Sequence, residues 1–124
     1  MSPVLIVEDN EINAEIITML LEEHGIPNEL AVDGVDSIEK CITKPKDYYS
    51  LILMDIHMPR MNGYEAAKKI KKELGMTAPV VAQTATHTTE ASIYEHRSYI
   101  DDYLFKPFKP EQLFSVISRY ISII

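Results

Sequence analysis

The sequence predicts an α/β fold in which a five-stranded parallel sheet is covered by helices on both faces. Short apolar runs alternate five times with longer amphipathic stretches, which is the pattern of repeated strand–helix units. Three of the runs are almost continuously apolar, as expected of strands that are buried on both faces. Hydrophobic residues make up 46% and charged residues 25% of the chain, so the composition is that of a folded globular protein.

The five predicted strands are short and rich in β-branched residues and leucine. They are expected at Val4–Val7, Glu29–Val32, Leu51–Met54, Val80–Ala82 and Tyr103–Phe105.

Helices are predicted between the strands from apolar residues at helical spacing. The expected buried stripes are Ile12, Ile16, Met19 and Leu20; Val35, Ile38 and Ile42; Ala66, Ala67, Ile70 and Leu74; and Leu113, Val116, Ile117, Tyr120 and Ile121. Gly25 and Gly75 end the first and third helices, and Pro110 suits the first turn of the last. The stretch 88–99 has few apolar residues and predicts an unusually polar fourth helix.

Size and charge limit the possible functions. A chain of 124 residues predicts one domain over residues 1–124. The net charge of −7 argues against binding to nucleic acid or to an anionic membrane surface. Cys41 is the single cysteine, so no internal disulfide forms, and a reducing cytoplasm is the expected compartment. No apolar run approaches the roughly 20 residues of a membrane-spanning helix.

The candidate functional residues follow the predicted strands. Glu8 and Asp9 follow the first strand and Asp55 follows the third. The carboxyl ends of parallel strands meet at one edge of the sheet, where ligands bind in such folds. Three carboxylates in one small volume repel unless a cation neutralises them, and hard oxygen ligands that leave room for water favour Mg²⁺.

Two further side chains extend this cluster. Thr84 follows the fourth strand and Lys106 the fifth, so a hydroxyl and an ammonium join the acids. A cation site, a carboxylate, a hydroxyl and an ammonium together suit phosphoryl transfer, with the carboxylate as the nucleophile.

At these positions the chain resembles the receiver domain of two-component response regulators. The resemblance rests on Val-Glu-Asp-Asn (7–10), Met-Asp-Ile-His-Met-Pro-Arg-Met-Asn-Gly (54–63), Ala-Gln-Thr-Ala (82–85) and Asp-Tyr-Leu-Phe-Lys-Pro (102–107). It implies a flavodoxin-like, doubly wound sheet with strand order 2-1-3-4-5 and five helices.

The resemblance also implies roles for individual residues. Asp55 would accept the phosphoryl group, Asp9 would bind Mg²⁺ directly, and Glu8 would bind it through water. Asp55 and the main-chain carbonyl of His57 would complete the protein ligands. Thr84 and Lys106 would bind the phosphoryl group, and Tyr103 would report the conformational switch. The loops would be shaped by Pro59, Gly63 and Pro107. The side chains of His57 and Thr86 would tune the rate of hydrolysis.

The implied partners are a histidine kinase or a histidine phosphotransfer protein, with a downstream protein target as a further possibility. Asn10 and Asn13 resemble the start of the first helix in receivers of hybrid kinases or in stand-alone receivers. The domain would catalyse its own phosphorylation and dephosphorylation but would not be a turnover enzyme. No nucleic-acid or membrane contact is expected of this domain.

Three alternatives remain open at this stage. A magnesium-dependent phosphatase with an aspartate nucleophile shares the same residue types, but usually carries an Asp-x-Asp after its first strand, where this chain has Glu8-Asp9. A flavodoxin needs a phosphate-binding loop at that place, and these two acids would repel the phosphate. A pseudo-receiver would only bind partners, and a phosphorylation assay separates it from a true receiver.

Overall fold

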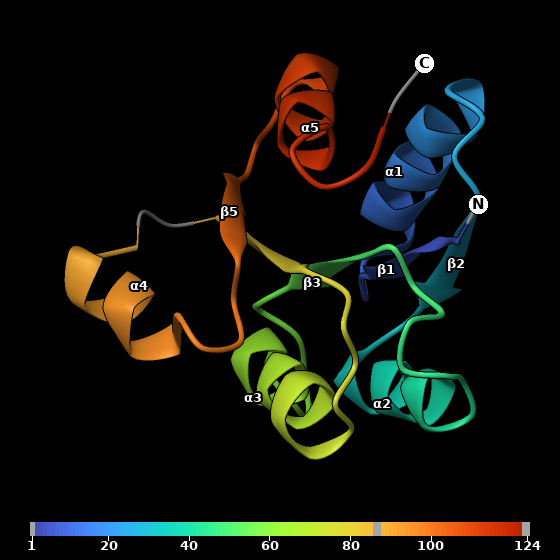
Figure 1. Cartoon of the computed structure of the whole chain (residues 1–124). Helices are drawn as coiled ribbons and strands as arrows, with labels where there is room; N and C mark the ends of the chain where they lie inside the picture. The colour runs from blue at the N-terminus through green and yellow to red at the C-terminus, as the bar shows by residue number, and fades with distance from the viewer. Residues whose placement is uncertain (1, 86–87, 123–124) are drawn as a thin grey trace.

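The computed structural model describes residues 2–85 and 88–122 and contains a five-stranded parallel sheet in the order β2-β1-β3-β4-β5 (Figure 1). The predicted fold class is therefore confirmed. The strands are β1 Val4–Val7, β2 Asn28–Ala31, β3 Leu51–Asp55, β4 Val80–Thr84 and β5 Asp102–Phe105. Strand β1 has the predicted bounds, β3, β4 and β5 differ from them by one or two residues at one end, and β2 begins and ends one residue early.

Helices cover both faces of this sheet (Figure 1). Their bounds are α1 Glu11–Glu23, α2 Gly34–Ile42, α3 Gly63–Lys68, the π-helical turn η1 Lys69–Glu73, α4 Glu90–His96 and α5 Pro110–Ile117. Helices α1 and α5 pack on one face, α2 and α3 on the other, and α4 lies beside the edge strand β5 (Figure 1). The predicted third helix is thus an α-helix that widens into one π turn. Pro110 stands at the start of α5, as predicted.

The core consists of two apolar layers, one on each face of the sheet. All residues of β1, β3 and β4 are buried, which explains why their sequences lack a polar alternation. The α1/α5 layer contains Ile6, Leu53, Val81 and Leu104, and the α2/α3 layer contains Val7, Met54 and Ala82. Cys41 is buried in the second layer, as the sequence suggests.

The predicted buried face of the first helix is wrong. Residues Ala14, Ile17 and Leu21 are buried, whereas Ile12, Ile16 and Met19 are 70%, 44% and 51% exposed. The helix carries apolar side chains around most of its circumference, so the apolar pattern is compatible with more than one face. The face that packs on the sheet includes the small side chain of Ala14, which allows a close approach.

The predicted buried face of the second helix is also partly wrong. The sequence pattern predicts a buried Ile42, but its side chain is 62% exposed, and the buried residues are Gly34, Ser37 and Cys41. The backbone at Gly34 approaches Met61 so closely that a Cβ there would lie 3.1 Å from the Met61 carbonyl oxygen. Helix α2 therefore presents small residues at this contact. The fourth helix buries no residue, in agreement with its polar sequence.

Side-chain caps start the helices next to the carboxyl ends of the strands. The side chain of Asn10 accepts a hydrogen bond from the Asn13 amide at 3.0 Å, and Asn62 forms a capping box with Glu65. These caps end the loops that carry the candidate site. None of the described helices combines the length and the apolar character of a membrane-spanning segment.

Candidate functional site

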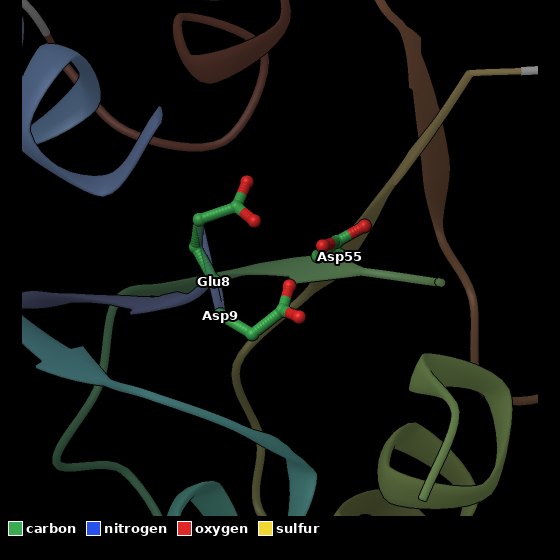
Figure 2. A group of neighbouring side chains, drawn as sticks. All are labelled: Glu8, Asp9 and Asp55. Carbon is green, nitrogen blue, oxygen red and sulfur yellow. The ribbon is translucent and has the colours of Figure 1, made fainter. Parts of the chain in front are cut away.

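Three carboxyl groups meet where β1 and β3 end. The two strands pair in register from Val4 with Leu51 to Val7 with Met54, so Glu8 and Asp9 continue one strand beside Asp55 on the other. One carboxylate oxygen of each residue lies within 4.8 Å of the others. Figure 2 shows the Glu8 side chain on the side of the sheet that faces α1, and the Asp9 side chain on the opposite side. Parallel pairing thus brings the predicted acids together.

The carboxyl groups differ in burial and protonation. Glu8 and Asp55 are 2% and 4% exposed, whereas Asp9 faces solvent. Burial raises the pKa of Asp55, and the neighbouring carboxyl group of Glu8 raises it further. Partial burial and the neighbouring Asp55 carboxyl group raise the pKa of Asp9. Both shifts show that negative charge is costly here until a cation or a proton neutralises it.

Lys106 supplies one neutralising charge. Its ammonium lies 3.1 Å from Glu8 Oε1 and 3.4 Å from Asp55 Oδ1, and the side chain is 21% exposed. The amide of Lys106 donates a hydrogen bond to the Thr84 carbonyl at 2.8 Å, which holds the end of β5 against β4. The following peptide bond, Lys106–Pro107, is cis. Lys106 therefore bridges two of the acids.

The side chains of Thr84 and His57 contact each other next to Asp55. The Thr84 hydroxyl is 3.3 Å from His57 Nε2, and the His57 amide donates to Asp55 Oδ1 at 3.2 Å. Thr84 ends β4 and is 3% exposed. The sequence indicated both residues but not the contact between their side chains. Thr86 lies outside the described residues.

The loop after β3 is shaped by Gly63. A Cβ at Gly63 would collide with the Asp55 carbonyl oxygen and would lie 2.8 Å from the Ile56 Cα, so the position has no room for a side chain. The Gly63 amide donates to the Ile56 carbonyl at 2.9 Å, and the Met61 amide donates to the Pro59 carbonyl at 2.8 Å. The chain therefore folds back tightly onto the end of β3.

An ion pair between Arg60 and Asp33 was not anticipated from the sequence. Arg60 has a positive φ of 68° and its guanidinium binds the Asp33 carboxylate. Asp33 also caps α2 by accepting from the Asp36 amide at 2.8 Å. That hydrogen bond, followed by the contact with Arg60, lowers the pKa of Asp33. The pair ties the loop after β3 to the loop after β2, and charge alone gave no signal for this pairing.

Tyr103 lies on β5 with its ring against the α2/α3 layer. Its hydroxyl is buried and next to the phenol of Tyr64, although the two groups do not meet hydrogen-bond geometry. Burial, followed by the Tyr64 phenol, raises the pKa of Tyr103. Tyr64 in turn stacks on His96 of α4, with ring centroids 3.7 Å apart. These contacts connect Tyr103 to the fourth helix.

The acidic cluster has the chemistry of a site for a hard divalent cation. Its donors are carboxylate oxygens from Glu8, Asp9 and Asp55, and the exposure of Asp9 leaves one side open to water. Few protein ligands and an open side suit Mg²⁺, which keeps several waters when bound to proteins. The residues therefore fit the expected cation.

The sequence matches the family model described as "Response regulator receiver domain" over residues 4–118. It is 36% identical over 121 residues to the osmosensing histidine protein kinase SLN1 of Saccharomyces cerevisiae, covering 94% of this chain and 10% of that protein. It is 40% identical over 121 residues to hybrid signal transduction histidine kinase G of Dictyostelium discoideum, covering 94% of this chain and 3% of that protein. The chain thus spans a tenth or less of these kinases.

Comparison with solved structures also finds receiver domains and related proteins. The receiver domain of the sensor histidine kinase PA1611 from Pseudomonas aeruginosa, described with a magnesium ion in its active-site cleft, matches with a TM-score of 0.81, 31% identity and 96% coverage of both chains. Vibrio cholerae chemotaxis protein CheY4 matches with a TM-score of 0.85, 25% identity and coverage of 98% of this chain and 99% of that one. Sequence, fold and acidic cluster agree: this chain belongs to the response regulator receiver domain family of two-component systems.

Proposed function

We propose that Asp55 is the phosphoacceptor of this receiver domain and that the acidic cluster binds Mg²⁺. One observation carries this proposal: a nearly buried carboxylate lies between two other acids and the ammonium of Lys106. The Asp55 pKa is raised, so the carboxylate loses less solvation in reacting than an exposed acid would. Among the three acids, Asp55 is the one held by both Lys106 and the His57 amide.

In the proposed reaction, a carboxylate oxygen of Asp55 attacks the phosphorus of a phosphohistidine. The new O–P bond forms as the N–P bond breaks, and the electron pair of that bond stays on the imidazole nitrogen, which then takes a proton. Mg²⁺, when held by Glu8, Asp9, Asp55 and the His57 carbonyl, would neutralise charge on the transferring group. Lys106 would turn from Glu8 to the phosphoryl oxygens, and Thr84 would donate its hydroxyl to one of them.

The partner that supplies the phosphoryl group is proposed to be a histidine kinase or a histidine phosphotransfer protein. The similarity to hybrid kinases supports this assignment. We propose that residues 1–124 form one receiver domain in the cytoplasm, and that its chemistry is confined to its own phosphorylation and dephosphorylation. Phosphorylation would change the conformation of the domain, and a downstream protein would recognise that change.

Incubation with Mg²⁺ and a small acyl phosphate tests this function and separates it from its rivals. Intact-mass measurement should show one phosphoryl group per chain, absent without Mg²⁺ and absent in Asp55→Asn. Sustained release of inorganic phosphate over many turnovers would instead indicate a phosphatase. A chain that binds Mg²⁺ but never gains mass would be a pseudo-receiver, and the proposal would be wrong.

A further inference from the structure

A pocket lies beside the acidic cluster, between α1 and the loop that follows β5. It has a volume of about 520 Å³, within the range of small-molecule sites in proteins. Its walls are mainly apolar and include Ile16, Ile17 and Phe108. Glu8 and Lys106 close the side that adjoins the acceptor site. The pocket shares Glu8 with the proposed Mg²⁺ site, but neither Asp9 nor Asp55 lines it.

The side chain of Gln83 makes this pocket unusual. Gln83 is fully buried, lines the pocket, and within the described residues neither its Nε2 nor its Oε1 has a hydrogen-bond partner. Its position on β4 explains the direction of the side chain: Val81, two residues earlier, belongs to the α1/α5 layer, and alternate residues of a strand point to the same face. The amide is therefore buried in an apolar layer.

An amide in such a place is costly unless something pairs with it. Leaving a buried donor or acceptor unpaired costs the desolvation of that group, and Gln83 has both. The other polar residues that line the pocket are Glu8, Asn13 and Lys106, and none of them forms a hydrogen bond with the Gln83 amide. A molecule that enters the pocket would supply the missing hydrogen bonds once the Gln83 side chain, whose amide atoms are closed to solvent in this structure, turns toward it.

We infer that this pocket is a binding site for a small neutral ligand that carries a carboxamide or lactam next to an apolar body. A primary amide offers one donor and one acceptor side by side, which is the complement of the Gln83 amide. The apolar body would lie against Ile16, Ile17 and Phe108. Neutrality follows from the lining: the charges of Glu8 and Lys106 compensate each other, so a charged ligand would have to break their pair.

Benzamide is a suitable probe because it has a compact ring and one primary amide. Titration of the ¹⁵N-labelled protein should give saturable shifts of the Gln83 side-chain amide and of the backbone amides of Ile17 and Phe108. Acetophenone has nearly the same shape but lacks the N–H donor, and benzoate carries a charge. We expect both to bind at least tenfold more weakly than benzamide, because one lost neutral hydrogen bond that leaves a buried partner is worth about that factor.

The variant Gln83→Met keeps the length of the side chain and removes its amide. It should weaken benzamide binding at least tenfold, while the control Gln112→Glu, on the exposed start of α5, should leave it unchanged. Asp55→Asn should also bind benzamide normally, so this result does not depend on the acceptor chemistry. Equal binding of benzamide and acetophenone, or undiminished binding to Gln83→Met, would overturn the inference. Absence of any saturable shift of the Gln83 amide would show that the pocket holds only water.

Discussion

The hydroxyl of Thr84 lies 3.3 Å from Nε2 of His57, whose amide donates a hydrogen bond to the candidate acceptor Asp55. In the proposed phosphorylated state the same hydroxyl donates to a phosphoryl oxygen on Asp55. Phosphorylation would then exchange the His57 contact of Thr84 for a contact with an anion. Strands β4 and β5 are paired, with Ala82 opposite Tyr103 and Thr84 opposite Phe105. A movement of Thr84 would therefore be passed directly to β5, the strand that carries Tyr103.

We predict that a phosphoryl mimic, beryllofluoride, changes the environment of Thr84 and Tyr103 together. A charge-assisted hydrogen bond contributes about 1.5–3 kcal/mol, which shifts a two-state equilibrium by roughly 10- to 100-fold. The shift is therefore partial, and some active-like population exists beforehand. NMR with Mg²⁺ and beryllofluoride should show coupled shifts at Thr84, Tyr103, and the Tyr64 and His96 rings. Unchanged spectra over these residues would exclude the switch but not the acceptor.

Replacing Asp9 should separate metal binding from folding. Asp9→Ala should lose Mg²⁺-dependent phosphorylation, because it removes the exposed carboxylate of the cluster. The same change should raise the melting temperature without Mg²⁺ by a few degrees, because it relieves repulsion with Asp55. Thermal unfolding with and without Mg²⁺ measures both effects. Glu39→Ala, at an exposed position of α2, is the control for loss of one negative charge. A lower melting temperature for Asp9→Ala would show a structural role instead.

The raised pKa values predict opposite effects of pH in the presence and absence of Mg²⁺. In the folded state Asp55 and Asp9 hold protons at a pH where the unfolded chain has lost them, because their pKa values are raised above 3.8. Their contribution to stability without Mg²⁺ therefore falls as pH rises from about 4 through the raised values. The stabilisation by Mg²⁺ should grow over the same range, since the metal needs deprotonated acids.

Melting temperatures measured against pH test this. The difference between wild type and Asp55→Asn isolates the contribution of Asp55 from that of Asp33, whose pKa is lowered and which acts in the opposite direction. A difference that does not change with pH would contradict the raised pKa of Asp55.

The loop after β3 offers a test of backbone strain. Arg60 has φ of 68°, a conformation that costs roughly 1 kcal/mol for a residue with a Cβ and little for glycine. Arg60→Gly and Arg60→Ala both lose the ion pair with Asp33, but only alanine keeps the strain. We expect Arg60→Gly to be more stable than Arg60→Ala in urea unfolding by at most about 0.6 kcal/mol, because the strain of roughly 1 kcal/mol is partly offset by the roughly 0.4–1 kcal/mol that glycine costs through the entropy of the unfolded chain. A lower stability of Arg60→Gly than of Arg60→Ala would show that the loop relaxes around alanine.

The meeting of the acids could be predicted because it depends on topology. Once Glu8, Asp9 and Asp55 are placed at the ends of parallel strands, strand order brings them together without any knowledge of side-chain packing. The faces of the helices could not be predicted in the same way. Helix α1 offers both an Ile12–Ile16–Met19 stripe and an Ala14–Ile17–Leu21 stripe, and the sheet selects the second. That selection depends on fit in three dimensions.

Contacts between loops also could not be predicted from the sequence. Asp33 and Arg60 are distant in the chain, and charges of opposite sign are too common to predict a pair. In the sequence, Gln83 is only one residue of the Ala-Gln-Thr-Ala motif (82–85). The packing of β4 shows that its side-chain amide is buried and, within the described residues, has no hydrogen-bond partner.

The identity of the phosphorylated residue is the most direct test of the whole account. Borohydride reduces an aspartyl phosphate to homoserine, which marks the position in a peptide map. After treatment with acyl phosphate and Mg²⁺, we predict homoserine at position 55 and at no other aspartate, with none formed when Mg²⁺ is chelated. Homoserine at Asp9 in place of Asp55, or a phosphorylated chain that yields none at position 55, would contradict the account.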